Sequence, residues 1–140
     1  MPTSIPPIRP DATRPGGAAE AMVWDALMSQ LDEDWTLFHG LRLLSADAES
    51  RELDFVLIHR QHGLLAIECK GAGLVCERGG RWVRLGPEGK RSPAKDPVAQ
   101  VESARHALVR ALGERWRDAT GETRLPLVHG HVIVTPRATR

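Results

Sequence analysis

The chain has 140 residues, 41% of them apolar and 26% charged, a composition typical of one globular domain that excludes a disordered or fibrous protein. Its formal net charge of +1 excludes a protein drawn to nucleic acid by bulk charge alone. Two cysteines are too few for a disulfide framework, and no apolar run approaches the roughly 20 residues that cross a bilayer, so we expect a cytoplasmic protein without a membrane partner.

The N-terminal part of the chain predicts an arm and then a domain. Residues 1–17 are rich in proline and predict an extended arm, and residues 18–140 predict a single domain. Apolar residues at helical spacing predict a helix over Ala18–Leu31. The apolar run Trp35–Leu44 then predicts a strand, and the polar stretch Ser45–Ser50 predicts a loop.

Two hairpins are predicted in the middle of the chain. The runs Leu53–His59 and Gly63–Lys70 are rich in β-branched and aromatic residues and flank a short turn. The runs Leu74–Glu77 and Arg81–Leu85 flank a pair of glycines and predict a second hairpin. The Gly- and Pro-containing stretch Gly86–Lys95 predicts a loop.

A long helix and a final strand are predicted in the last third of the chain. Asp96 is a helix cap and Pro97 suits a first turn, and the apolar spacing continues to Gly113. The run Leu127–Thr135 predicts a strand, which a crossover helix can bring parallel to an earlier strand. The order predicts a mixed sheet with helices packed on it, and the short remainder after this strand suggests a piece of a longer protein.

The end of the first hairpin carries the strongest chemical signal. The run Leu64–Lys70 begins apolar on both faces, as a central strand does, but Glu68 and Lys70 then point to the same face. A turn centred near Gln61 places Asp54 across from Glu68, so that two carboxylates face each other. Like charges repel, so a cation between them is the natural remedy, and carboxylate oxygens favour a hard ion such as Mg²⁺ or Mn²⁺.

Two further polar residues lie on helix faces that should meet the sheet. Glu20 shares its face with apolar residues of the first helix, and Gln100 starts a small-residue face on the second. A metal held by paired carboxylates, with Lys70 two residues further along the strand, is suited to phosphodiester hydrolysis. The metal activates water, and the lysine orients that water or stabilises the charge of the transition state.

These residues resemble the PD-(D/E)xK nuclease superfamily, and more closely its nuclease-related domain (NERD). Leu53 stands where the name motif of the superfamily has proline. The resemblance spans about Gly17 to Val134 and is carried by three phrases, Glu52–Phe55, Gly63–Gly71 and Asp96–Gln100.

The resemblance implies an α/β restriction-endonuclease-like core of α-β-β-β-α-β order, with a central mixed sheet flanked by helices. It also implies Mg²⁺-dependent cleavage of DNA, in DNA processing or repair, by a domain often attached to a helicase or another nucleic-acid module. By position, Asp54 and Glu68 are the implied metal ligands, and Lys70 is the catalytic lysine. Glu20 is the helix carboxylate near the metal, and Gln100 is the polar residue of the late helix.

Most of these signals also have an ordinary structural interpretation. Glu68 and Lys70 alone would suit a surface ion pair, and Glu20 would suit a first-turn acid stabilised by the helix dipole. A second Glu-x-Lys, at Glu88–Lys90, lies in a Gly- and Pro-rich turn and is interpreted as solvated loop. The alternative function is a nuclease-fold domain that binds DNA or a protein partner without cleavage.

Basic residues gather in the second hairpin and the loop after it. They predict a phosphate-binding rim beside the site, or else a solvated hairpin. His129 and His131 alternate on the last strand and could hold Zn²⁺, but ordinary strand histidines are the favoured interpretation. Cys69 points away from Glu68 and is interpreted as a buried thiol. The basic residues are Arg78, Arg81, Arg84, Lys90, Arg91 and Lys95.

Overall fold

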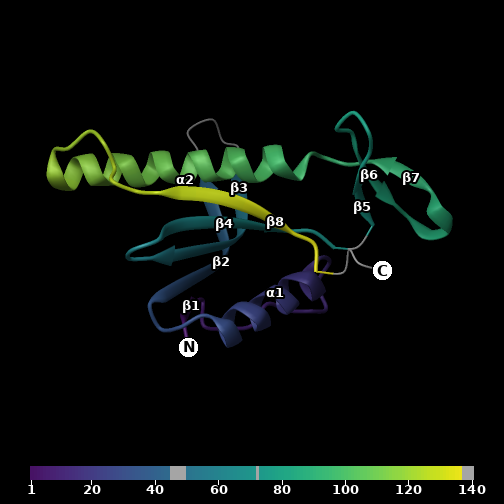
Figure 1. The fold of residues 1–140 in the computed structure, drawn as a ribbon, viewed down its shortest axis with the longest axis horizontal. Helices are drawn as coiled ribbons and strands as arrows, with labels where there is room; N and C mark the ends of the chain where they lie inside the picture. Colours follow the sequence, from purple (N-terminus) through teal and green to yellow (C-terminus); the bar gives the residue numbers. More distant parts are fainter. Residues whose placement is uncertain (45–49, 72, 137–140) are drawn as a thin grey trace.

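The computed structural model describes residues 1–44, 50–71 and 73–136, which form a mixed α/β structure with two helices and a central mixed sheet (Figure 1). In chain order the elements are β1 (Thr3–Ile5), α1 (Gly17–Gln30), β2 (Trp35–Leu44), β3 (Ser50–His59), β4 (Gly63–Cys69), β5 (Leu74–Cys76), β6 (Trp82–Leu85), the 3₁₀ turn η1 (Pro87–Gly89), β7 (Arg91–Pro93), α2 (Pro97–Thr120) and β8 (His129–Val134).

The central sheet has the strand order β1-β2-β3-β4-β8. Strand β3 runs antiparallel to both β2 and β4, whereas β8 pairs in parallel with β4 after the crossover through α2. The predicted parallel pairing of the last strand is therefore confirmed. None of the helices in the described part of the chain is long and apolar enough to cross a membrane.

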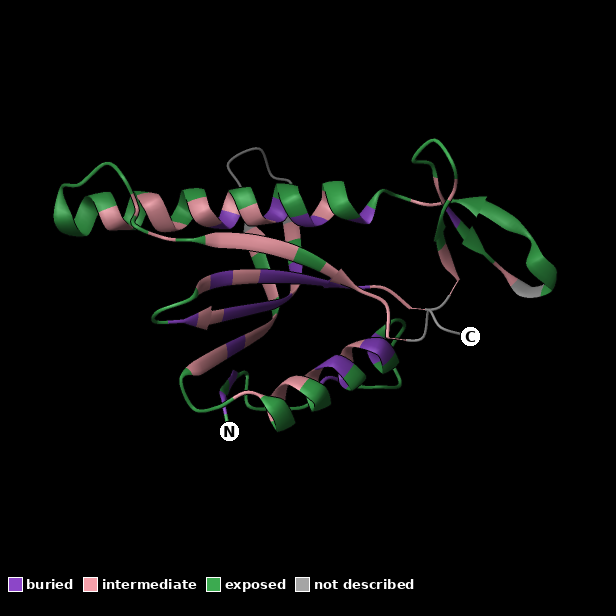
Figure 2. Ribbon diagram, in the orientation of Figure 1, coloured by how far each residue is buried: buried purple, intermediate pink, exposed green. Residues whose placement is uncertain are grey.

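The two helices lie on opposite sides of the sheet, and each covers its own buried cluster (Figure 1). Val101 and Leu108 of α2 pack with Leu64 of β4, while Val23 of α1 packs with Phe55 of β3. Figure 2 shows that burial is concentrated in β3 and β4, the strands that lie between the two clusters. These strands are apolar on both faces because both faces are covered.

Strand β1 is an addition to the sheet that the sequence pattern did not predict. It lies inside the proline-rich segment predicted as an extended arm, and it pairs in parallel with β2 from Thr3 to Ile5. The buried hydroxyl of Ser4 accepts a hydrogen bond of 3.1 Å from the indole N–H of Trp24, which joins this strand to α1. The arm is thus packed against the rest of the chain.

A separate three-stranded sheet, in the order β5-β6-β7, extends beyond the end of the central sheet (Figure 1). The predicted second hairpin is confirmed as β5 and β6. The prediction of a loop over Gly86–Lys95 was wrong, because Arg91–Pro93 forms β7 and pairs with β6. All three residues of β7 are exposed and none is a strand former, so backbone hydrogen bonds hold a strand that periodicity does not reveal.

The start of α2 follows the prediction, but its end does not. The carboxylate of Asp96 caps the helix by accepting hydrogen bonds from the backbone N–H groups of Val98 and Ala99. The predicted end at Gly113 was wrong, since the helix continues to Thr120 and ends at Gly121, whose φ of 77° is left-handed. A glycine inside a helix costs about 1 kcal/mol relative to alanine, which the turns on either side of it offset.

The other predicted boundaries agree with the structure to within about two residues, except at the start of β3. That strand begins at Ser50, three residues before the predicted run and inside the predicted loop. The remainder of that loop, residues 45–49, lies outside the described residues.

The hairpin of β3 and β4 has the register that the sequence predicts, with His59 opposite Gly63 and Phe55 opposite Ile67. One further step places Asp54 across from Glu68. Residues three apart normally face opposite sides of a strand, yet Leu53 and Val56 share the buried cluster under α2. On β2, the left-handed Gly40 (φ 65°) lies opposite this point, and the pairing of β2 with β3 is interrupted between Gly40 and Asp54.

Candidate active site

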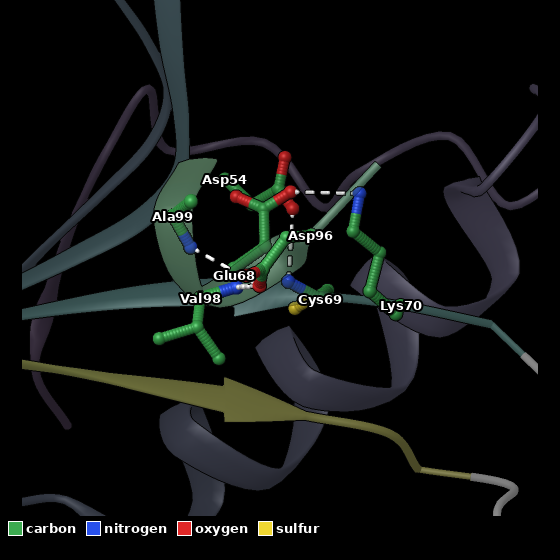
Figure 3. Close-up of polar contacts among 7 residues, drawn as sticks. All are labelled: Asp54, Glu68, Cys69, Lys70, Asp96, Val98 and Ala99. Carbon is green, nitrogen blue, oxygen red and sulfur yellow. Dashed lines mark hydrogen bonds and ion pairs between the residues drawn. The ribbon is translucent and has the colours of Figure 1, made fainter. Parts of the chain in front are cut away.

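Asp54 and Glu68 bring two carboxylates together where the pairing of β3 with β4 ends (Figure 3). The Oδ2 atom of Asp54 accepts a hydrogen bond of 2.9 Å from the backbone N–H of Cys69. The side chain thus continues the ladder one step beyond the last paired residues, Phe55 and Ile67. This hydrogen bond fixes the orientation of the Asp54 carboxylate beside Glu68.

Lys70 lies next to this pair and provides its positive charge. Its Nζ atom lies 3.2 Å from Oε1 of Glu68, and both side chains are mostly buried (Figure 3). The two residues therefore share a face of β4, as their spacing predicts. An ion pair with so little solvent around it is not the exposed pair of the ordinary interpretation.

Burial and mutual repulsion leave the carboxylates poorly stabilised in their charged form. Burial raises the pKa of Glu68 to about 7, and the charge of Asp54 adds to this effect, while Lys70 acts in the opposite direction. The pKa of Asp54 is also raised, first by burial and then by the charge of Glu52, although the N–H of Cys69 acts in the opposite direction. Two adjacent acids with raised pKa values are typical of a site that binds a cation or moves protons.

Glu20 reaches the same place from the first turn of α1. Burial raises the pKa of Glu20 to about 7, and the next largest cause is the charge of Asp54, followed by that of Glu52. Asp54 therefore interacts with Glu20 on one side and with Glu68 on the other. The oxygens of Glu20, Asp54 and Glu68 do not all lie within 4.8 Å of one another among the described residues.

Gln100 completes the site from the helix side. It lies in the first turns of α2, and its Oε1 atom is buried without a hydrogen-bond partner within the described part of the chain. A buried amide oxygen with no partner costs free energy, so it marks a position where a ligand, ion or water would be stabilised. Gln100 shares a cavity of about 490 Å³ with Asp54, Glu68 and Lys70.

Three residues that the sequence analysis did not select also line this cavity. Arg51 and Glu52 precede Asp54 on β3, and Ser103 lies one helical turn after Gln100. Glu52 is two residues from Asp54 and so shares its alternation, and Ser103 shares the helix face of Gln100. These spacings could have selected Glu52 and Ser103 once Asp54 and Gln100 were chosen.

The six basic residues of the predicted rim divide into three groups. Lys95 lines the cavity of Asp54 and Glu68, and Arg84 lines a neighbouring one. Arg91 donates a hydrogen bond of 2.7 Å to the carboxylate of Glu77, which neutralises it. The remaining three, Arg78, Arg81 and Lys90, are exposed near the turns of the small sheet.

The predicted histidine pair and cysteine have clear structural surroundings. The guanidinium of Arg105 donates to Nδ1 of His131 at 2.8 Å and contacts Nδ1 of His129, which joins α2 to β8. These ring nitrogens act as acceptors in that contact. Cys69 is buried, and its pKa is raised by burial and by the charge of Asp54, so the thiol is a poor nucleophile.

Another group of possible metal ligands lies at the opposite end of the β3–β4 pairing, at His59. Ligand atoms of Asp32, Asp34 and His59 lie within 4.8 Å of one another, although both aspartates are exposed. Oδ1 of Asp32 accepts from the backbone N–H of Asp34, as in an Asx turn. Hydrogen bonds of the local turn account for this group.

Comparison with known families gives one match, and comparison with curated proteins and with solved structures gives none. Residues 15–135 match the nuclease-related domain family, which covers both helices and the whole of the candidate site.

Proposed function

This chain belongs to the nuclease-related domain family, and from that membership and the geometry of its site we propose that it is a metal-dependent nuclease that hydrolyses phosphodiester bonds in DNA. One observation carries the proposal. Asp54 and Glu68 form a buried pair of carboxylates with raised pKa values, beside Lys70 and in an open cavity of about 490 Å³. An acid pair of this kind would be a liability in a purely structural domain.

The residues present fit a hard divalent cation. Mg²⁺ and Mn²⁺ prefer oxygen ligands, and a cation offsets the repulsion that raises the pKa of Glu68. Asp54 and Glu68 would hold the ion, with Glu20 as a further carboxylate, and the partnerless Oε1 of Gln100 offers one more oxygen. When bound, such an ion lowers the pKa of a water molecule and polarises the phosphoryl oxygens.

The side chains then have separate tasks. The Nζ atom of Lys70 is held by Glu68 at 3.2 Å, where it donates hydrogen bonds to the attacking water or to the phosphoryl oxygens as their negative charge grows. The N–H of Cys69 keeps Asp54 oriented. The amide of Gln100 and the ammonium of Lys95 lie on the cavity wall and position the substrate.

The wider context of the proposal rests on the family and on the order of the elements. Helix α1, strands β2, β3 and β4, helix α2 and strand β8 follow one another in the chain, which supports a restriction-endonuclease-like core. DNA processing or repair is the corresponding proposed role, with a helicase or another nucleic-acid module as a fused or associated partner. Two free cysteines support a reducing, cytoplasmic location.

The experiment is cleavage of labelled single-stranded and double-stranded DNA and of supercoiled plasmid, in Mg²⁺, in Mn²⁺ and in EDTA. We expect metal-dependent cleavage by the wild type, and a loss of about 100-fold or more in Lys70→Ala and Glu68→Gln. Glu88→Gln is the matched control, because Glu88 belongs to the second Glu-x-Lys of the chain and is exposed in a turn.

Circular dichroism must show that each variant is folded. If the wild type cleaves no substrate, or if Glu68→Gln cleaves as fast as Glu88→Gln, the catalytic proposal fails. Binding of DNA without cleavage would then favour the alternative, a nuclease-fold domain that binds DNA or a protein partner.

A further inference from the structure

The candidate active site opens into a second, smaller cavity of about 280 Å³. The two cavities have three lining residues in common, Lys70, Lys95 and Gln100, so they adjoin each other. Leu74, Arg84 and Pro93 of the small sheet line the second cavity. Arg84 of β6 is the charged residue that the small sheet contributes to this cavity.

The linings of the two cavities differ in charge. The first contains three carboxylates and three cationic side chains, whereas the described lining of the second contains no acidic residue. The second cavity has Arg84 and Lys95 on its walls, together with Lys70, which is paired with Glu68. A cavity lined by cationic side chains and no acid is suited to an anion, and phosphate is the anion that both lysine and arginine bind well.

The charges of Arg84 and Lys95 are available to such an anion. In the part of the chain that the structure describes, neither side chain has an ion pair, whereas Arg91 on the adjacent strand is paired with Glu77. The first turn of α2 does not compete for the anion, because Asp96 already accepts from the N–H groups of Val98 and Ala99. The side chains of the small sheet and of its connection to α2 therefore define the cavity.

We propose that the cavity of Lys70, Arg84, Lys95 and Gln100 binds the phosphate of the nucleotide next to the scissile bond. This inference rests on the proposed nuclease function, since that function places the scissile phosphate beside Asp54 and Glu68. Neighbouring phosphates of one strand are separated by a single sugar, and the two cavities adjoin each other through their shared lining residues. Arg84 and Lys95 are thus positioning residues that fix the register of the strand.

The consequence for the small sheet is a division of labour among its basic residues. Arg84 and Lys95 bind a defined phosphate, whereas Arg78, Arg81 and Lys90 lie away from both cavities and supply at most unspecific attraction. A strand held at two successive phosphates is cut at one fixed bond, because the distance between the two cavities sets which bond meets the carboxylates.

The test measures binding without cleavage, with Ca²⁺ in place of Mg²⁺, by fluorescence anisotropy of a labelled oligonucleotide. A series of oligonucleotides carries one neutral methylphosphonate, moved along the strand. In the wild type we expect one position beside the cleavage site where the neutral group weakens binding about 10-fold. In Arg84→Gln/Lys95→Gln we expect natural DNA to bind about 10-fold more weakly, and that position to lose its sensitivity.

Two controls make the result specific. Arg115→Gln removes an exposed charge from the far half of α2 and should change neither binding nor the methylphosphonate profile. The charge-preserving variant Arg84→Lys/Lys95→Arg should retain the sensitive position. The slope of log K against log salt should fall by about 0.7 to 0.9 in Arg84→Gln/Lys95→Gln, as expected for one lost phosphate contact.

The inference is overturned if Arg84→Gln/Lys95→Gln keeps the same methylphosphonate profile as the wild type, or if Arg115→Gln loses the sensitive position equally. These outcomes are distinct from failure of the proposed function, which shows as absence of Mg²⁺-dependent cleavage. A wild type that fails to cleave but has a sensitive position abolished by Arg84→Gln/Lys95→Gln would retain the phosphate site and lose the nuclease.

Discussion

The pairing of β3 with β4 has two ends, one beside Asp54 and the other at His59, and each has acidic side chains beside a cavity of similar size. At the Asp54 end the cavity has about 490 Å³, and at the His59 end about 500 Å³. The two ends are about 16 Å apart along the strand. The ligand atoms of Asp32, Asp34 and His59 are the more tightly grouped, since all three lie within 4.8 Å of one another.

What separates the two ends is how far their polar atoms are already satisfied. Nδ1 of His59 accepts from the backbone N–H groups of Gln61 and His62, so its neutral ring carries the proton on Nε2 and has no lone pair left for a metal. Asp32 and Asp34 are exposed to water. At the other end, Asp54 and Glu68 are largely buried, burial raises the pKa of both, and the charge of Asp54 raises that of Glu68 further. Buried carboxylates that are poorly stabilised in their charged form indicate a site better than closely spaced ligand atoms do.

The largest expected difference between the two ends is in catalysis. Asp54→Asn keeps the shape of the side chain but removes the charge that we propose holds the metal, so cleavage should fall by about 100-fold or more, or about 2.7 kcal/mol of transition-state stabilisation. Asp34→Asn makes the same change in the exposed group and should leave the cleavage rate unchanged. Initial rates of DNA cleavage in Mg²⁺ measure both. Equal losses in the two variants would place the chemistry at neither end alone.

A smaller difference is expected in the pH dependence of stability without metal. Glu20 and Glu68 have pKa values raised to about 7, and an acid whose folded-state pKa is raised stabilises the fold below its ordinary value and loses that effect as pH rises. In EDTA, the free energy of unfolding should therefore fall between about pH 4.5 and 7.5, by roughly 2 kcal/mol after solvent screening is allowed for.

Two variants test whether the pH dependence of stability comes from the Glu68 end or from the Asp34 end. Glu68→Gln cannot ionise, so urea unfolding at a series of pH values should give a shallower fall than in the wild type. Asp34→Asn should follow the wild type, because its group is exposed. A wild type whose stability rises over the same pH interval would contradict the picture of a poorly stabilised acid pair.

Much of the fold could be predicted because its central strands are long and strongly patterned. The hairpin of β3 and β4 has a short turn, so its register follows from the position of Gln61, and that register brings Asp54 to Glu68. Strand β7 and strand β1 could not be predicted in this way. Each has three residues, and backbone pairing with a neighbouring strand holds it in place.

The candidate site divides along the same line. Glu68 and Lys70 can be selected from the sequence because two charges end an apolar strand. No periodicity shows that the pairing of β2 with β3 is interrupted at Gly40 and Asp54. The partnerless Oε1 of Gln100 and the lining residues shared by the two cavities depend on packing between α2 and the small sheet. Such features arise from contacts between distant segments, which spacing along one segment does not contain.

The smallest of the expected effects distinguishes most directly which of the two acidic groups binds a cation. Mg²⁺ at ten times its dissociation constant should stabilise the wild type by about 1.4 kcal/mol, or about 5 °C in Tm, because it binds the folded state alone. Thermal unfolding in EDTA and in Mg²⁺ measures this shift. Asp54→Asn/Glu68→Gln should lose it, since the ligands are gone, and Asp32→Asn/Asp34→Asn should keep it. The reverse result would make the exposed aspartates the cation site, and would show that grouped ligand atoms outweigh buried, unmet charge.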